Sequence, residues 1–198
     1  MTDGTVVEGE SNIPKAKKHI RRVSLYPHHA APVQSALSAI LSADIILLGP
    51  GSLYTSIMPN LLVDGVADAL RQSRAIKVYI CNVMTQPGET DGYTAARHVK
   101  AILDHAGKGV VDYALVNASK IPAQTAQAYA AQGSYPVPVD AAALNQLGVG
   151  VIPADIVSAT DPGHHDPKKL IRQVMKLLET LRSSESVGRQ LRSDSTLK

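Results

Sequence analysis

The chain has 198 residues, of which 44% are hydrophobic, and it contains one Cys and no Phe or Trp. This length predicts a single domain with an aliphatic core, and one cysteine excludes a disulfide framework and is typical of a reducing, cytoplasmic environment. The net charge is only +3, no apolar run is long enough to cross a membrane, and the first residues do not resemble a signal peptide.

Hydrophobic periodicity predicts strands that alternate with helices. The expected strands cover residues 5–9, 19–25, 45–48, 77–81, 112–116, 137–139 and 149–152. The expected helices cover residues 33–41, 64–73, 94–105, 122–132 and 141–146, and one more begins at Asp166-Pro167. We expect residues 183–198, which are rich in Ser and in charge, to be disordered. Apolar strands that alternate with amphipathic helices predict an α/β fold, with a mostly parallel sheet covered on both faces.

The most informative motif follows the expected strand 45–48, where the chain turns through Gly49-Pro50-Gly51-Ser52. Such a turn places backbone N–H groups at the carboxyl edge of the sheet, where α/β folds bind ligands and where phosphate is favoured. The turn lacks the Lys of a Walker loop and the third Gly of a dinucleotide-binding loop. A strand-to-helix turn without a ligand is therefore an equal alternative. The candidate phosphate-binding residues are Gly49, Pro50, Gly51, Ser52, Tyr54, Thr55 and Ser56.

A second polar loop, residues 82–93, follows the next expected strand and so lies at the same edge of the sheet. Two adjacent polar loops predict a cleft, which favours a binding site over the alternative that Thr90 or Asp91 only caps the next helix. Amide and hydroxyl groups suit a base or a sugar, and carboxylates suit a divalent metal or ribose hydroxyls. The candidate ligand contacts are Asn82, Thr85, Gln86, Glu89, Thr90 and Asp91, with Asn117 past a third strand, where turn formation is the alternative.

Other site types are not supported by the sequence. The pairs His28-His29 and His164-His165 lack the spacing of a zinc site, so we expect no structural metal. Ser52 does not lie in the Gly-x-Ser-x-Gly elbow of serine hydrolases. The basic run Lys15–Arg22 has no interleaved aromatic residues, so we interpret it as a solvated edge and expect no nucleic-acid partner.

Several of these segments together resemble the bacterial gluconeogenesis factor family (YvcK-like proteins), which is related to 2-phospho-L-lactate transferase, CofD. The resemblance runs from about residue 3 to residue 180 and is carried by residues 3–13, 43–63, 77–93, 136–140 and 165–167. It implies a Rossmann-like, three-layer α/β/α, CofD-like domain over residues 1–182. Full-length relatives begin with a Gly-Gly-Gly-Thr-Gly loop that is absent here, so we expect a C-terminal portion of the family fold, incomplete at the N-terminus.

The resemblance also implies a function. YvcK-like proteins are associated with UDP-sugars, chiefly UDP-N-acetylglucosamine, and with cell shape during gluconeogenic growth. We therefore expect a cytoplasmic, regulatory protein without turnover, whose only cofactor would be Mg²⁺ carried by the nucleotide. Because the missing N-terminal strands would leave a sheet edge uncovered, we also expect a homo-oligomer. Tyr135 matches a position associated with sugar-nucleotide binding, whereas His164 stands where relatives often have an Arg, which weakens a phosphate contact. The alternative is a CofD-like transferase of a phospho-lactyl group, although the chain has no Trp or Phe to stack on a deazaflavin acceptor.

Overall fold

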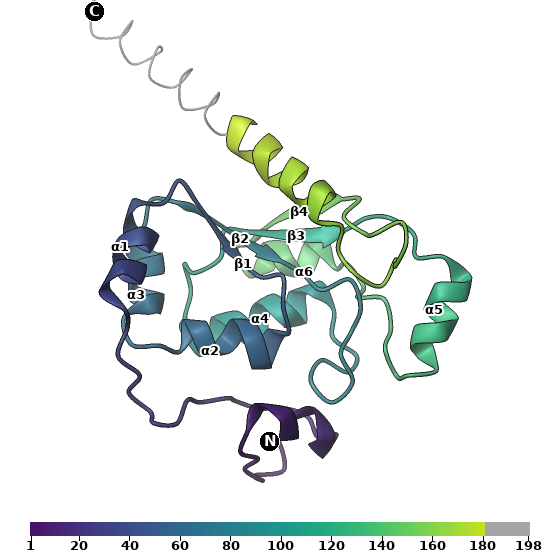
Figure 1. Cartoon of the computed structure of the whole chain (residues 1–198), viewed down its shortest axis with the longest axis horizontal. Coiled ribbons are helices and arrows are strands. Elements are labelled where there is room, and N and C mark those ends of the chain that lie inside the picture. Colours follow the sequence, from purple (N-terminus) through teal and green to yellow (C-terminus); the bar gives the residue numbers. More distant parts are fainter. Residues whose placement is uncertain (181–198) are drawn as a thin grey trace, which may run out of the picture.

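Four parallel strands form one sheet in the computed structural model, which describes residues 1–180 (Figure 1). The strands lie in the order β1 (Ile45–Leu48), β2 (Ile76–Ile80), β3 (Tyr113–Asn117) and β4 (Gly150–Ala154). In the register of the sheet, Leu48 lies beside Tyr79, Ile80 beside Leu115, and Leu115 beside Ile152. The carboxyl ends of β1 and β2 therefore lie side by side, as the sequence predicted.

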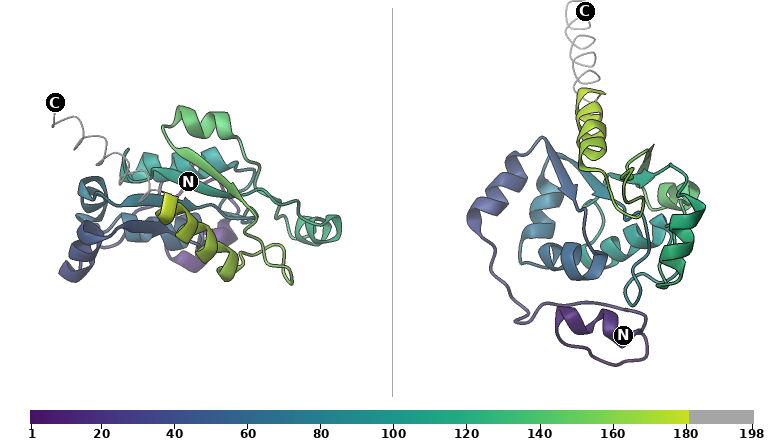
Figure 2. Two further views of the ribbon diagram at one scale, coloured as in Figure 1. Left: turned by 90° about the horizontal axis from the view of Figure 1, so that it is seen from above. Right: turned by 45° about the vertical axis from the view of Figure 1, so that its right-hand side comes forward.

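Helices cover both faces of this sheet. The helices are α1 (Gln34–Ser42), α2 (Met58–Leu61), α3 (Val66–Gln72), α4 (Ala95–Ala106), α5 (Ala123–Ala130) and α6 (Ala141–Gln146), and residues 167–180 are also helical. On one face, Tyr79 and Ala114 pack in a core cluster with Ile102 of α4 and Leu144 of α6. On the other face, Val78 and Leu115 pack with Leu170 of the helix over residues 167–180. Figure 2 shows α6 and this last helix on opposite sides of the sheet, which confirms the three-layer α/β/α fold.

Local signals in the sequence explain why α4 forms where it was predicted. The Thr94 side chain accepts a hydrogen bond from the backbone N–H of Arg97 at 3.2 Å and caps the start of the helix. Val99, Ile102 and Ala106 recur at helical spacing and are buried, so the helix lays an apolar stripe on the sheet. Gly107 ends the helix with φ 85°, a conformation that favours glycine.

The structure corrects three expected strands. Residues 5–9 and 19–25 belong to no strand, and the N-terminal segment instead contains 3-10 turns at Glu10–Asn12 and Pro14–Ala16. That segment lies away from the sheet (Figure 1), so no neighbouring strand pairs with these β-prone runs. Residues 137–139 form no strand either, because Pro136 and Pro138 lack the N–H groups that a ladder needs. Only an isolated bridge joins Pro136 to Met84.

Two further expectations concern the C-terminal tail and membrane-spanning helices. The tail over residues 183–198 lies outside the described residues. Among residues 1–180, no helix has both the length and the apolar composition needed to cross a membrane.

Candidate functional site

Hydrogen bonds join the two predicted ligand loops at the carboxyl edge of the sheet. The Asn82 Nδ2 atom donates to the backbone oxygen of Gly51 at 3.1 Å. The Gln86 Nε2 atom donates to Ser52 Oγ at 2.7 Å. The loops meet because parallel β1 and β2 end beside each other, so these amide groups hold the glycine turn in place.

Glu89 makes the most unusual contact between the loops. Its carboxyl group accepts hydrogen bonds from Thr55 Oγ1 at 3.0 Å and from the backbone N–H of Tyr54 at 3.4 Å, and the residue is only 6% exposed. Burial raises the pKa of this carboxyl above its ordinary value, and the hydrogen bonds from Thr55 and Tyr54 partly oppose that shift. Tyr54 lies in the π-helical turn Leu53–Ile57. Its N–H, which we predicted to bind phosphate, therefore donates to a carboxyl group of the protein itself.

Residues 82–87 and Glu89 of the second loop line a cavity of about 390 Å³, which we call the polar cavity. Amides, hydroxyls, two histidines and one carboxyl group line it, together with small apolar side chains. Among its described lining residues there is no Lys or Arg. The lining residues are Pro14, Asn82, Val83, Met84, Thr85, Gln86, Pro87, Glu89, Tyr129, Gln132, Ser134, Gly163, His164 and His165.

The loop that follows α5 is hydrogen-bonded to Thr85, one of the lining residues of the polar cavity. The backbone N–H of Thr85 donates to the Tyr135 oxygen at 2.7 Å, and the N–H of Tyr135 donates to Thr85 Oγ1 at 2.9 Å. Ser134 Oγ donates to the Thr85 oxygen at 2.6 Å. These bonds hold Ser134 against the cavity, while the Tyr135 side chain is 54% exposed and is not among the lining residues.

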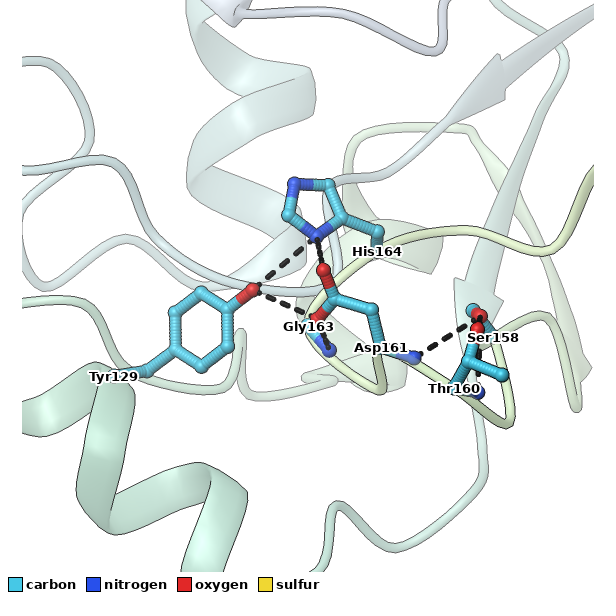
Figure 3. Close-up of polar contacts among 6 residues, drawn as sticks. All are labelled: Tyr129, Ser158, Thr160, Asp161, Gly163 and His164. Atoms are coloured by element: carbon cyan, nitrogen blue, oxygen red, sulfur yellow. Dashed lines mark hydrogen bonds and ion pairs between the residues drawn. The ribbon is translucent and has the colours of Figure 1, made fainter.

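Two further lining residues, Tyr129 and His164, belong to a polar cluster with Asp161 (Figure 3). Tyr129 of α5 donates from its hydroxyl to Asp161 Oδ1 at 3.0 Å, and Asp161 Oδ2 lies 2.8 Å from His164 Nδ1. The Tyr129 hydroxyl lowers the pKa of Asp161, and it does so more than His164 does. Tyr129 was not among the predicted site residues, because nothing in the sequence places α5 beside the loop of Asp161.

The neighbouring His165 faces the sheet. Its Nε2 atom lies 3.0 Å from the backbone oxygen of Cys81, at the end of β2. Burial lowers the pKa of this imidazole, so it is neutral near pH 7 and donates to that oxygen. His165 therefore connects the cavity lining to the end of β2 without adding a positive charge to the cavity.

Other predicted site residues lie outside the polar cavity. Gly49, Pro50 and Ser56 line a second cavity of about 380 Å³, which we call the apolar cavity because Ile40, Leu47 and other aliphatic side chains form its walls. The predicted turn and loop are thus in contact but open onto different cavities. The structure does not bring all of the predicted residues to one cleft.

Three predicted residues make hydrogen bonds within their own loops. Thr90 Oγ1 accepts from the backbone N–H of Gln86 at 2.8 Å, and Asp91 accepts from the N–H of Gly88 at 2.7 Å. Asn117 accepts from the N–H of Ser119 at 3.0 Å, which is the turn considered as its alternative role. Thr94, rather than Thr90 or Asp91, caps α4. Within residues 1–180, no three His, Cys, Asp or Glu side chains are grouped so that they could hold a metal ion.

The family profile described as 2-phospho-L-lactate transferase CofD matches residues 1–157. The chain belongs to the CofD family. This CofD-family chain is 50% identical over 178 residues to the gluconeogenesis factor of Halalkalibacterium halodurans, which covers 89% of this chain and 55% of that protein. It is 46% identical over 180 residues to the gluconeogenesis factor of Bacillus subtilis, with 90% of this chain and 57% of that protein covered.

A solved structure agrees with the fold described above. A crystal structure of a Bacillus halodurans protein superposes with a TM-score of 0.85 at 50% identity, and it covers 88% of this chain and 57% of that chain. The CofD-family chain thus spans little more than half the length of the curated relatives it matches. The resemblance to the gluconeogenesis factors is confirmed.

Proposed function

We propose that this CofD-family chain is a cytoplasmic, regulatory module that binds a nucleotide sugar of the UDP-N-acetylglucosamine type in the polar cavity, without turnover. The observation that carries the proposal is the lining of that cavity. Side-chain amides, hydroxyls and one carboxyl group converge there from Asn82, Glu89 and Ser134, among others. Mg²⁺ would enter only as the counter-ion of the diphosphate.

Sugar and uracil groups are dense in hydrogen-bond donors and acceptors, and amide side chains supply both. Apolar surface from Val83, Met84 and Pro87 can pack against the faces of such rings. The similarity to two gluconeogenesis factors at 46% and 50% identity supports the same proposal. We also propose that the chain takes part in the control of cell shape during gluconeogenic growth.

Isothermal titration calorimetry with UDP-N-acetylglucosamine tests the proposal. Gln132→Leu removes an amide from the cavity lining, and Gln127→Leu makes the same change at an exposed position of α5 that does not line the cavity. We expect Gln132→Leu to weaken binding about three- to ten-fold, because a neutral hydrogen bond contributes about 0.5–1.5 kcal/mol. Gln127→Leu should bind as the wild type does. Absence of binding by the wild type would contradict the proposal.

The description of the family favours a second candidate function, transfer of a phospho-lactyl group from a nucleotide donor. In that reaction the acceptor hydroxyl attacks the donor phosphate, and the nucleoside monophosphate leaves. Incubating the chain with such a donor and a deazaflavin acceptor, and measuring release of the monophosphate, separates the two functions. Our proposal expects no release above a protein-free control.

A further inference from the structure

We propose that Glu89 determines the specificity of the polar cavity, because it accepts hydrogen bonds from the neutral sugar end of the ligand and keeps the phosphates away from that end. This inference rests on the proposed function and adds an orientation to it. Glu89 is the one carboxyl group among the described residues that line the cavity, and no Lys or Arg lines it. Among these lining residues, Glu89 is therefore the group that gives the cavity a negative charge.

The position of the Glu89 carboxyl group is fixed before any ligand arrives. Thr55 Oγ1 donates to one carboxyl oxygen at 3.0 Å, and the backbone N–H of Tyr54 lies 3.4 Å from the other. With 6% of its surface exposed, the side chain has little freedom to turn away. A binding group held in this way loses little conformational entropy when a ligand binds.

The chemistry of a carboxyl group then selects the ligand. The two carboxylate oxygens have four acceptor positions between them. The Thr55 hydroxyl, the Tyr54 N–H and the backbone N–H of Thr55 use three at most, so at least one remains for a ligand. A buried carboxylate gains from every further donor, because water reaches it poorly. Sugar hydroxyls and an acetamido N–H are donors, whereas an ionised phosphate offers only acceptors and a like charge. The diphosphate must therefore lie away from Glu89.

Nearby groups do not reverse this preference. The pKa of the His165 imidazole is lowered by burial, and it is neutral at the pH of the test below. His164 faces Asp161, whose carboxylate lies 2.8 Å from its Nδ1 atom, so a negative charge accompanies that ring. No described lining residue thus supplies a permanent positive charge that could hold a phosphate beside Glu89.

Calorimetry with two ligands tests the inference. UDP-N-acetylglucosamine and UDP are titrated at pH 7.5 into the wild type, Glu89→Gln and Glu8→Gln, which removes the same charge at an exposed position outside the cavity lining. The amide introduced by Glu89→Gln would keep an oxygen for the Thr55 hydroxyl and would lose the longer bond from the Tyr54 N–H, so the substitution removes the charge and preserves the shorter of the two bonds. We expect the wild type and Glu8→Gln to bind the nucleotide sugar at least ten-fold more tightly than UDP.

Glu89→Gln should lower the affinity for the nucleotide sugar about ten-fold and change the affinity for UDP less than two-fold. If Glu89→Gln does not fold, as judged by its melting curve, Glu89→Asp replaces it. The shorter side chain withdraws the carboxyl group from the sugar, so it should also lower the ratio of the affinity for the nucleotide sugar to the affinity for UDP. An unchanged ratio in the folded variant, or equal wild-type affinity for the two ligands, would overturn the inference and leave nucleotide binding intact. A wild type that binds neither ligand would overturn the proposed function and this inference together.

Discussion

Glu89 accepts a hydrogen bond from Thr55 Oγ1 at 3.0 Å, and 34 positions of sequence separate the two residues. The contact joins the loop after β2 to the π-helical turn after β1, so it fixes the geometry between two polar loops. The Glu89 carboxyl group therefore already accepts hydrogen bonds from the Tyr54 N–H and the Thr55 hydroxyl, two of the groups predicted to bind phosphate, without a ligand. This relationship is the structural basis of the orientation proposed above.

The first prediction concerns the close approach between Gly88 and the N-terminal segment. A Cβ atom on Gly88 would lie 2.1 Å from the backbone oxygen of Pro14, and the residue has φ +81°. We expect Gly88→Ala to displace Pro14, which lines the polar cavity, and to destabilise the fold by more than about 2 kcal/mol. Gly92→Ala is the matched control, because Gly92 has φ +66° and nothing within 4 Å of its added Cβ. Urea unfolding of both variants measures the difference, and equal destabilisation would show that the clash with Pro14 relaxes at no cost.

The second prediction concerns the pH dependence of stability. His98 is fully buried, and burial lowers the pKa of its imidazole from 6.5 to about 4. Between these values the unfolded chain binds a proton that the folded chain does not, so stability decreases as the pH falls below 6.5 and levels off below 4. We expect His98 to account for a loss of about 2 kcal/mol between pH 7.5 and pH 5.

Urea unfolding of the wild type and of His98→Gln at these two pH values tests the prediction. Glutamine can still donate to the backbone oxygen of Thr94, which lies 2.9 Å from His98 Nδ1, but it does not titrate. The pKa values of His105 and His165 are also lowered by burial, so the variant should keep part of the acid sensitivity. An identical loss in both proteins would assign the effect to those other histidines.

The third prediction concerns self-association. β1 is an edge strand of the described sheet, and Leu47 on it is 42% exposed beside the apolar cavity. An uncovered edge favours pairing with another chain, so we expect the 198-residue chain to form a homo-oligomer through β1. Leu47→Lys should yield a monomer, whereas Leu41→Lys on α1, where the side chain is 49% exposed, should not.

Light scattering across a salt series distinguishes this contact from one through the basic run Lys15–Arg22. An apolar, backbone-bonded contact should persist in salt, whereas a contact through the basic run would be screened. Dissociation by salt alone would show that the chains associate through the basic run and not through β1. A wild-type monomer at every salt concentration would contradict the prediction altogether.

The sequence predicted the sheet well, because its strands are apolar runs followed by turns. β1 was predicted at its observed bounds, and so was α6. Residues 5–9 show the limit of such patterns, because a β-prone run forms a strand only beside another strand. The sequence also placed Gln86 and Ser52 at one edge, where they bond to each other.

The sequence could not show how the loops divide between two cavities. That division depends on the contact between Glu89 and Thr55 and on the bond from the Tyr129 hydroxyl to Asp161, which are tertiary contacts between segments about 30 residues apart. Gly51 illustrates the same point. Its φ is not in the left-handed region, and a Cβ would meet Ser56 Cβ at 3.2 Å, so its need for glycine comes from packing rather than from the dihedral angle. We still expect Gly51→Val to weaken nucleotide binding, because the enlarged side chain disturbs the turn that Asn82 holds.

A structure from crystals grown with UDP-N-acetylglucosamine would show whether the polar cavity binds the nucleotide sugar in the proposed orientation. We expect ligand density in the polar cavity, with sugar hydroxyl or acetamido groups within hydrogen-bond distance of Glu89 and the diphosphate directed away from it. Density only in the apolar cavity beside Gly49 and Ser56, or no bound ligand at saturating concentration, would contradict the account.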